Sequence, residues 1–196
     1  MKTALKYKLY EKPFPHWIIK DFLPTAEAVD LIKALSKEKF YLKEADLFTF
    51  YQTNDLKSAS NKILQKFNHY LSSEFIDELE EMTKIKLKRN SLDISGNLYQ
   101  NTNYLLPHDD RLENRSLAFL YYLSGLEKKD GGSLALYDTK KISGKETPNK
   151  IVKRIVPQFN TMVIFQVSNR SFHEVEELLQ KKQRLTISGW FHHAKK

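Results

Sequence analysis

The sequence has 196 residues, 41% of them hydrophobic, and a formal net charge of +8. This length supports one sizeable hydrophobic core and favours a single domain. Because the chain has no cysteine, disulfides, thiolate metal sites and cysteine nucleophiles are all excluded.

The positive charge is scattered along the chain, with short basic runs at 86–89, 128–129 and 181–184. No aromatic residues are interleaved with these runs as in an RNA-binding signature. We therefore expect a solvated basic surface without direct sequence-specific nucleic-acid binding, which leaves a general attraction to an RNA-rich partner open. The first residues lack the apolar stretch of a secretory signal, and no run approaches the ~20 residues of a membrane span. We expect a cytoplasmic protein with no membrane partner.

The first ninety residues are expected to be mainly helical. A short strand is predicted at 16–22, before Pro24. Thr25 is then a candidate cap for a helix whose apolar residues over 28–35 fall at helical spacing. A second helical tract is predicted at 57–81, with Ser72 and Ser73 as its point of division.

From Leu92 onward the hydrophobic period changes to two, which indicates strands. The segments with this pattern are 92–100, 102–108, 116–123, 133–138, 150–156, 161–167 and 184–191. The polar segment 140–150 is expected to be a mobile loop. Helices followed by short strands predict an α+β protein, with a helical layer over about 1–90 and a β-sandwich or barrel over about 91–196. With no repeat and no linker, we expect one domain spanning 1–196.

A histidine and two carboxylates lie together at the end of one predicted strand. If the chain stays extended, His108 and Asp110 project to one side and Asp109 to the other. His173 follows another predicted strand, 65 positions beyond His108. Two histidines and one carboxylate in this layout are typical of the facial triad that holds Fe(II) and leaves coordination positions open. The alternative is that the histidines have ordinary surface or core roles, because the pattern also arises by chance.

The predicted strand 184–191 places Arg184, Thr186, Ser188 and Trp190 on one face. An arginine that points into a barrel needs an anion, because a buried unpaired charge is costly. Its planar guanidinium suits a carboxylate, and the Thr186 hydroxyl can donate a further hydrogen bond. The alternative is an ion pair with a core aspartate or glutamate. A dicarboxylate bound to the metal at one end and to Arg184 at the other would satisfy both groups.

Together these motifs resemble those of the 2-oxoglutarate- and Fe(II)-dependent oxygenases of the prolyl-hydroxylase branch. The segments YQNTNYLLPHDDRLENRSLAFLYYL, GGSLALYD, SFHEVEELL and RLTISGWFH are similar to the catalytic domain of the ribosomal prolyl 3-hydroxylases, and the resemblance covers about residues 47–193. It implies a double-stranded β-helix, a jelly-roll or cupin-like barrel, supported by N-terminal helices. The eukaryotic members carry a second β-helix domain after the catalytic one. Because this sequence ends at Lys196, directly behind the last catalytic strand, we expect the catalytic domain alone.

The resemblance implies roles for individual residues. His108, Asp110 and His173 become the iron ligands. Arg184 becomes the partner of the distal carboxylate of 2-oxoglutarate, with Thr186 where the family often has serine.

Two tyrosines and two glycines also correspond to family positions. Tyr122 matches a tyrosine that hydrogen-bonds the same carboxylate, and Tyr99 lies near another pocket tyrosine. For both tyrosines the alternative is core packing. Gly131 and Gly132 are expected to form a turn rather than to bind a ligand.

The implied reaction is hydroxylation of a C–H bond with Fe(II), 2-oxoglutarate and O2, with ascorbate as a candidate reductant. The implied substrate is a prolyl residue of a protein, in particular a small-subunit ribosomal protein. One alternative is a hydroxylase of a free amino acid or other small molecule. An alternative of another class is a non-catalytic β-helix that binds a basic or RNA-rich partner.

Overall fold

The computed structural model describes residues 5–112 and 114–194. Within them no helix has the length and apolar character needed to cross a membrane. The helical elements are α1 (Thr25–Leu35), the short η1 (Leu56–Ser58), α2 (Lys62–His69), the π-helical turn η2 (Tyr70–Glu74), α3 (Ile76–Thr83) and the short η3 (Lys128–Asp130). The strands are β1 (Tyr7–Tyr10), β2 (His16–Ile19), β3 (Phe40–Ala45), β4 (Phe48–Thr53), β5 (Leu87–Tyr99), β6 (Tyr104–His108), β7 (Arg115–Tyr122), β8 (Leu134–Ile142), β9 (Lys145–Ile155), β10 (Thr161–Gln166), β11 (His173–Val175) and β12 (Arg184–His193).

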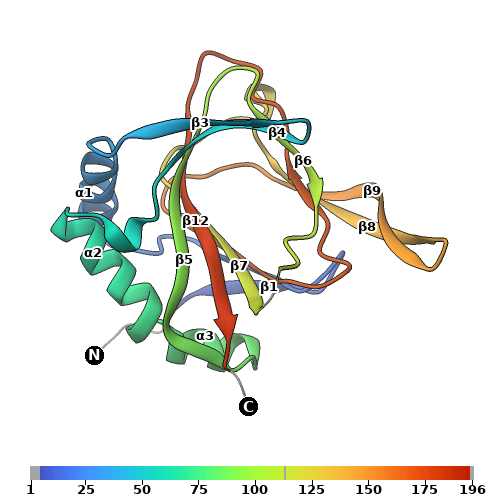
Figure 1. Ribbon diagram of the computed structural model, residues 1–196, viewed down its shortest axis with the longest axis horizontal. Helices are drawn as coiled ribbons and strands as arrows, with labels where there is room; N and C mark the ends of the chain where they lie inside the picture. Colours follow the sequence, from blue (N-terminus) through green and yellow to red (C-terminus); the bar gives the residue numbers. More distant parts are fainter. Residues whose placement is uncertain (1–4, 113, 195–196) are drawn as a thin grey trace.

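The strands form one curled antiparallel sheet in the order β1-β2-β10-β7-β12-β5-β4-β6-β11-β8-β9, with β3 paired to β4. Figure 1 shows this sheet curving round on itself, with α1 and α2 on one side and the β8–β9 hairpin projecting from the other. One wall of the curled sheet consists of β1, β2, β10, β7, β12 and β5. The opposite wall consists of β6, β11, β8 and β9. Strand β4 joins the two walls because it pairs with both β5 and β6.

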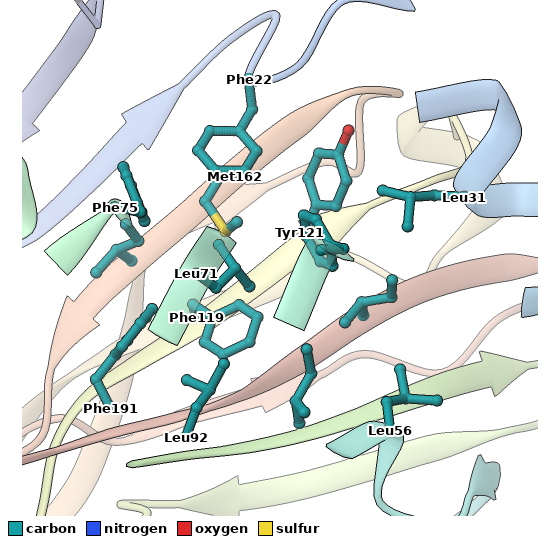
Figure 2. Close-up of a cluster of buried hydrophobic side chains, with 14 of the residues drawn as sticks. Phe22, Leu31, Leu56, Leu71, Phe75, Leu92, Phe119, Tyr121, Met162 and Phe191 are labelled. Atoms are coloured by element: carbon teal, nitrogen blue, oxygen red, sulfur yellow. The ribbon is translucent and has the colours of Figure 1, made fainter. Parts of the chain in front are cut away.

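The main hydrophobic core lies between the helices and the outer face of the first wall. Alternation along β7 sends Phe119 and Tyr121 to this core and Leu120 and Tyr122 to the barrel interior. Because β7 is buried on both faces, its sequence is a continuous apolar run rather than an alternating one. Figure 2 shows the helix-side core, which includes Phe22, Leu31, Leu71, Phe75, Met162 and Phe191.

The α+β prediction is confirmed, and so are a helix starting at residue 25 and a helical tract divided by η2 at Ser72 and Ser73. Two details are wrong. Pro24 rather than Thr25 occupies the N-cap of α1, and no side chain caps this helix. The first ninety residues are not mainly helical, because they also contain β1, β2, β3 and β4.

The β3–β4 hairpin is the largest departure from the prediction. Both strands are rich in aromatic residues, such as Phe40, Phe48 and Phe50, which favour a strand over a helix. In β4, Tyr51 lies opposite Leu98 of β5 and Phe48 opposite Leu105 of β6. The hairpin therefore completes the barrel instead of covering it.

The polar segment 140–150 is also not a loop. It forms the ends of β8 and β9, which pair from Leu134↔Ile155 out to Ile142↔Lys145. Ser143 and Gly144 both have positive φ, 50° and 79°, as a two-residue hairpin turn requires. All seven predicted strands are present, and the short β11 is an additional one.

Candidate active site

Strands β6 and β11 bring the candidate metal ligands together. His173, the first residue of β11, lies directly opposite His108, the last residue of β6. Asp110 lies two residues after His108 in the sequence. One ligand atom from each of the three side chains lies within 4.8 Å of the others. Asp110 Oδ1 is 3.4 Å from His108 Nε2, and Asp110 Oδ2 is 3.4 Å from His173 Nε2. The predicted trio is thus one convergent cluster, although its role as a ligand set stays a prediction.

Backbone carbonyls orient both imidazoles toward the centre of this cluster. His108 Nδ1 lies 2.9 Å from the Leu106 carbonyl oxygen, and His173 Nδ1 lies 2.8 Å from that of Ser171. A proton on Nδ1 in each ring leaves the Nε2 lone pair free for a metal. Two imidazole nitrogens and one carboxylate on one side of an ion are the donor set of non-haem Fe(II) oxygenases, so these residues fit the iron that the family motif implies.

The electrostatics of the cluster favour an ionised carboxylate. Burial opposes the charged form of Asp110, but the neighbouring imidazoles outweigh it and hold the pKa of Asp110 well below its usual range. Burial likewise acts to lower the pKa of His108, but the hydrogen bond and charge of Asp110 leave it raised. An anionic oxygen held between two imidazoles is a site prepared for a cation.

The geometry at Asp110 differs from the extended chain expected from the sequence. Strand β6 ends at His108, and Asp110 has a φ of 60°, so a left-handed turn directs its carboxylate to the cluster. The turn is held by the Ser171 hydroxyl, which donates to the Asp109 carbonyl at 3.1 Å. The Asp109 carboxylate pairs instead with Arg111, 2.8 Å from its Nε. Asp109 therefore points away from the cluster, as expected, but for a different reason.

Arg184 lies at the start of β12, and it is 1% exposed. Its Nε donates to the Gly132 carbonyl at 2.9 Å. The guanidinium lies 4.9 Å from the ring centroid of Tyr99 and 5.2 Å from that of Tyr122. The register explains this, because Arg184 is opposite Tyr99 on β5, and Thr186 is opposite Tyr122 on β7.

This end of the barrel contains buried hydrogen-bond donors. Arg184 Nη2 and the Tyr122 hydroxyl are both buried, and within the described residues neither has a hydrogen-bond partner of normal geometry, although the Arg184 side chain is close enough to the Tyr122 hydroxyl to act to lower its pKa. Burial raises the pKa of Tyr99 and of Tyr122, so both hydroxyls stay protonated at neutral pH. No aspartate or glutamate of the described residues pairs with Arg184, which removes the alternative of a core ion pair. A carboxylate would supply the missing partner of these donors.

One cavity of about 90 Å³ contacts both groups. The lining of this cavity includes both the His108, Asp110 and His173 cluster and the residues Arg184, Thr186 and Tyr99. Tyr99 also stacks on Phe50, with ring centroids 5.0 Å apart. It therefore both packs against a neighbouring aromatic ring and lines the cavity.

The sequence analysis did not identify a row of hydrogen-bonded polar side chains along the cavity wall. Gln52 Nε2 donates to Asn97 Oδ1 at 2.9 Å, and Asn97 Nδ2 donates to Ser188 Oγ at 2.8 Å. Asn97 is 5% exposed and lies in β5 two residues before Tyr99, so strand alternation was the signal that could have found it. Nearby, the Arg115 guanidinium stacks on Trp190, 3.4 Å from a ring centroid.

A cluster of two histidines and one carboxylate, facing a buried arginine across one β-barrel, has the features of a non-haem iron oxygenase. The family model of the 2OG-Fe(II) oxygenase superfamily matches residues 94–192, the stretch that holds these side chains. The chain belongs to this superfamily.

Curated relatives cover nearly the whole chain. It is 40% identical over 183 residues to prolyl 3-hydroxylase OGFOD1 of Xenopus laevis, covering 92% of this chain and 35% of that protein. It is 37% identical over 186 residues to prolyl 3-hydroxylase OGFOD1 of Mus musculus, covering 92% and 33% respectively. Prolyl 3-hydroxylase sudestada1 of Drosophila melanogaster is 32% identical over 200 residues, covering 97% and 37%. The chain thus spans about a third of the length of these relatives.

Solved structures show the same fold at low identity. A Pseudomonas putida prolyl-4-hydroxylase matches with a TM-score of 0.72 and 17% identity, covering 92% of this chain and 93% of that one. A Trichoplax adhaerens prolyl hydroxylase in complex with a hypoxia inducible factor peptide fragment matches with a TM-score of 0.68 and 20% identity, covering 90% and 83%. The predicted double-stranded β-helix is confirmed.

Proposed function

We propose that this chain catalyses the Fe(II)- and 2-oxoglutarate-dependent hydroxylation of a prolyl residue in a protein. The observation that carries the proposal is the single cavity that contacts the His108, Asp110 and His173 cluster and the buried Arg184. The names of the relatives, prolyl 3-hydroxylases at 32–40% identity, support prolyl as the acceptor.

In this proposal the residues divide into two binding groups. His108, Asp110 and His173 hold Fe(II) on one face, and the carbonyls of Leu106 and Ser171 keep the two imidazoles in the ligating tautomer. The bound iron, with 2-oxoglutarate and O2, supplies the oxidising power for C–H hydroxylation while 2-oxoglutarate is converted to succinate and CO2.

The second group fixes the co-substrate. Arg184 and the Tyr122 and Thr186 hydroxyls bind its distal carboxylate, and the stacked Tyr99 and Phe50 close the wall beside it. Burial of these donors makes their hydrogen bonds stronger than in water, because competing solvent is excluded. The side chains thus select a dicarboxylate and orient it.

For the protein substrate we propose a small-subunit ribosomal protein, which follows from the similarity to the ribosomal prolyl 3-hydroxylases. The net charge of +8 favours encounter with ribosomal RNA and opposes approach to a free basic protein. This would present the substrate within an RNA-containing particle rather than alone. A cytoplasmic location belongs to the same proposal.

The test is to incubate the protein with Fe(II), 2-oxoglutarate, O2 and the ribosomal proteins of its host, and to map peptides by mass spectrometry. We expect one added oxygen on a single proline, absent with His108→Ala, Asp110→Ala and His173→Ala and retained with the exposed control His193→Ala. Succinate formation with free proline and no modified peptide would assign a small-molecule hydroxylase instead. No 2-oxoglutarate turnover with any substrate would favour a non-catalytic binding module.

A further inference from the structure

The turn at Gly131 and Gly132 contacts Arg184 through a backbone carbonyl rather than through a side chain. The acceptor of Arg184 Nε is the carbonyl of Gly132. Gly131 and Gly132 have φ values of 76° and 66°, which glycine adopts without strain. A Cβ on Gly131 would lie 2.1 Å from the Glu177 carbonyl oxygen, so this position has no room for a side chain. The glycine turn therefore brings a backbone carbonyl to a place that other residues would not allow.

The same turn is joined to the segment that leads into β12. Gly132 N donates to the Glu177 carbonyl at 3.1 Å, and Leu179 N donates to the Asp130 carbonyl at 2.8 Å. These backbone bonds bring residues 177–179 alongside the turn. They fix how the two segments approach each other but do not touch the guanidinium.

An ion pair between the buried Asp130 and the solvent-exposed Lys182 closes the arrangement. Asp130 is 1% exposed, and its Oδ2 accepts from Lys182 Nζ at 2.7 Å and from the Glu127 backbone N–H at 2.7 Å. The hydrogen bond from Lys182 and that from the Glu127 amide hold the pKa of Asp130 below its usual range. The Asp130 carboxylate is therefore ionised at neutral pH, and its Oδ2 accepts both hydrogen bonds.

The ion pair of Asp130 with Lys182 lies next to the contact between Gly132 and Arg184 on the same two segments. Asp130 and Gly132 are two residues apart on one segment, and Lys182 and Arg184 are two residues apart on the other. The Asp130–Lys182 contact and the Gly132–Arg184 contact therefore form a closed ring in which each fixes the geometry of the other. Loss of the ion pair would remove one of the contacts that set the Gly132 carbonyl relative to the start of β12, while the backbone bonds between the segments remain.

We propose that Asp130 and Lys182 are positioning residues for co-substrate binding, acting on Arg184 through the Gly132 carbonyl. The inference rests on the proposed function, since it takes Arg184 as the partner of the distal carboxylate of 2-oxoglutarate. Neither residue lines the cavity, so neither is a catalytic residue.

The test uses calorimetry to measure the affinities of two ligands for the protein loaded with Mn(II). One is 2-oxoglutarate, and the other is 2-oxovalerate, which has a methyl group in place of the distal carboxylate. Asp130→Asn is close in size and can still accept from Glu127, and Lys182→Met keeps the aliphatic length. We expect each to weaken 2-oxoglutarate binding about tenfold through misplacement of Arg184, and to leave 2-oxovalerate binding unchanged.

The control is Lys129→Ala, which removes an exposed ion pair with Glu127 on the same turn and should change neither affinity. In an Arg184→Ala background, Asp130→Asn should have no further effect, because the residue through which it acts is gone. Equal losses for both ligands would indicate a merely structural role and overturn the inference.

Failure of the inference can be told from failure of the proposed function. If Arg184→Ala weakens 2-oxoglutarate binding while Asp130→Asn does not, the positioning role is wrong and the co-substrate site stands. If Arg184→Ala itself leaves 2-oxoglutarate binding unchanged, both are wrong. Thermal unfolding of each variant, measured without ligand, confirms that the protein compared is folded.

Discussion

Arg184→Ala gives the most direct measure of the co-substrate site. The side chain is 1% exposed, its Nη2 has no hydrogen-bond partner of normal geometry among residues 5–112 and 114–194, and its Nε is already bonded to the Gly132 carbonyl. Two N–H groups that meet a carboxylate there contribute about 1.5 kcal/mol each, toward the lower end for hydrogen bonds to charged groups. Their loss costs about 3 kcal/mol, which is roughly a hundredfold in affinity.

The assay is the KM for 2-oxoglutarate, obtained from succinate formation at saturating substrate. We expect a rise of about a hundredfold for Arg184→Ala and a smaller rise for Arg184→Lys, because lysine keeps the charge without the planar fork. Arg154→Ala removes an arginine that pairs with Glu176 on the surface, and it serves as the control with unchanged KM. An Arg184→Ala protein with the KM of the wild type would place the dicarboxylate elsewhere in the molecule.

Four further outcomes are expected. His16 is buried, and burial lowers its pKa to about 4, so only the unfolded chain gains a proton as pH falls from 6.5 toward 4. Urea unfolding should therefore show about 2 kcal/mol of stability lost between pH 7 and pH 5, and a slope that persists in His16→Asn would contradict this. Gly189→Ala should destabilise the fold by about 3 kcal/mol, because its Cβ would overlap the Asp93 carbonyl, while Gly144→Ala, which has open space but a φ of 79°, should cost about 1 kcal/mol in the same unfolding assay. Tyr122→Phe should raise the 2-oxoglutarate KM about tenfold, and an unchanged KM would leave Tyr122 a packing residue. Co(II) and Ni(II) should inhibit succinate formation by displacing Fe(II), and full activity in their excess would argue against the N/O ligand set.

The chemistry of the site was more predictable from the sequence than its geometry. Spacing of two along a strand placed Arg184 and Thr186 on the face that borders the cavity, because alternation is fixed by the pleat. The same rule gave a mistaken route for Asp110, which reaches the cluster through a left-handed turn. Aspartate is one of the few residues that adopt this conformation easily, yet a short motif contains nothing that distinguishes the turn from an extended chain.

The regions that sequence reasoning missed depend on contacts between distant segments. The β3–β4 hairpin lies in a stretch with helices on either side, and its pairing with β5 and β6 is a tertiary choice. The ion pair of Asp130 with Lys182 joins residues 52 positions apart. Composition and periodicity report local preference, so neither could have revealed these partners.

Strand register, more than loop structure, assembles the candidate site. On one wall β11 places His173 opposite His108, and on the other β12 places Arg184 opposite Tyr99. A slip of one residue in either pairing would turn one side chain of the pair to the opposite face. The helix-side core prevents such a slip in the first wall, because Phe119 and Phe191 pack there from β7 and β12. Burial of apolar side chains on the outer face of that wall thus holds the polar side chains of its inner face in place, which links the stability of the fold to the geometry of the proposed chemistry.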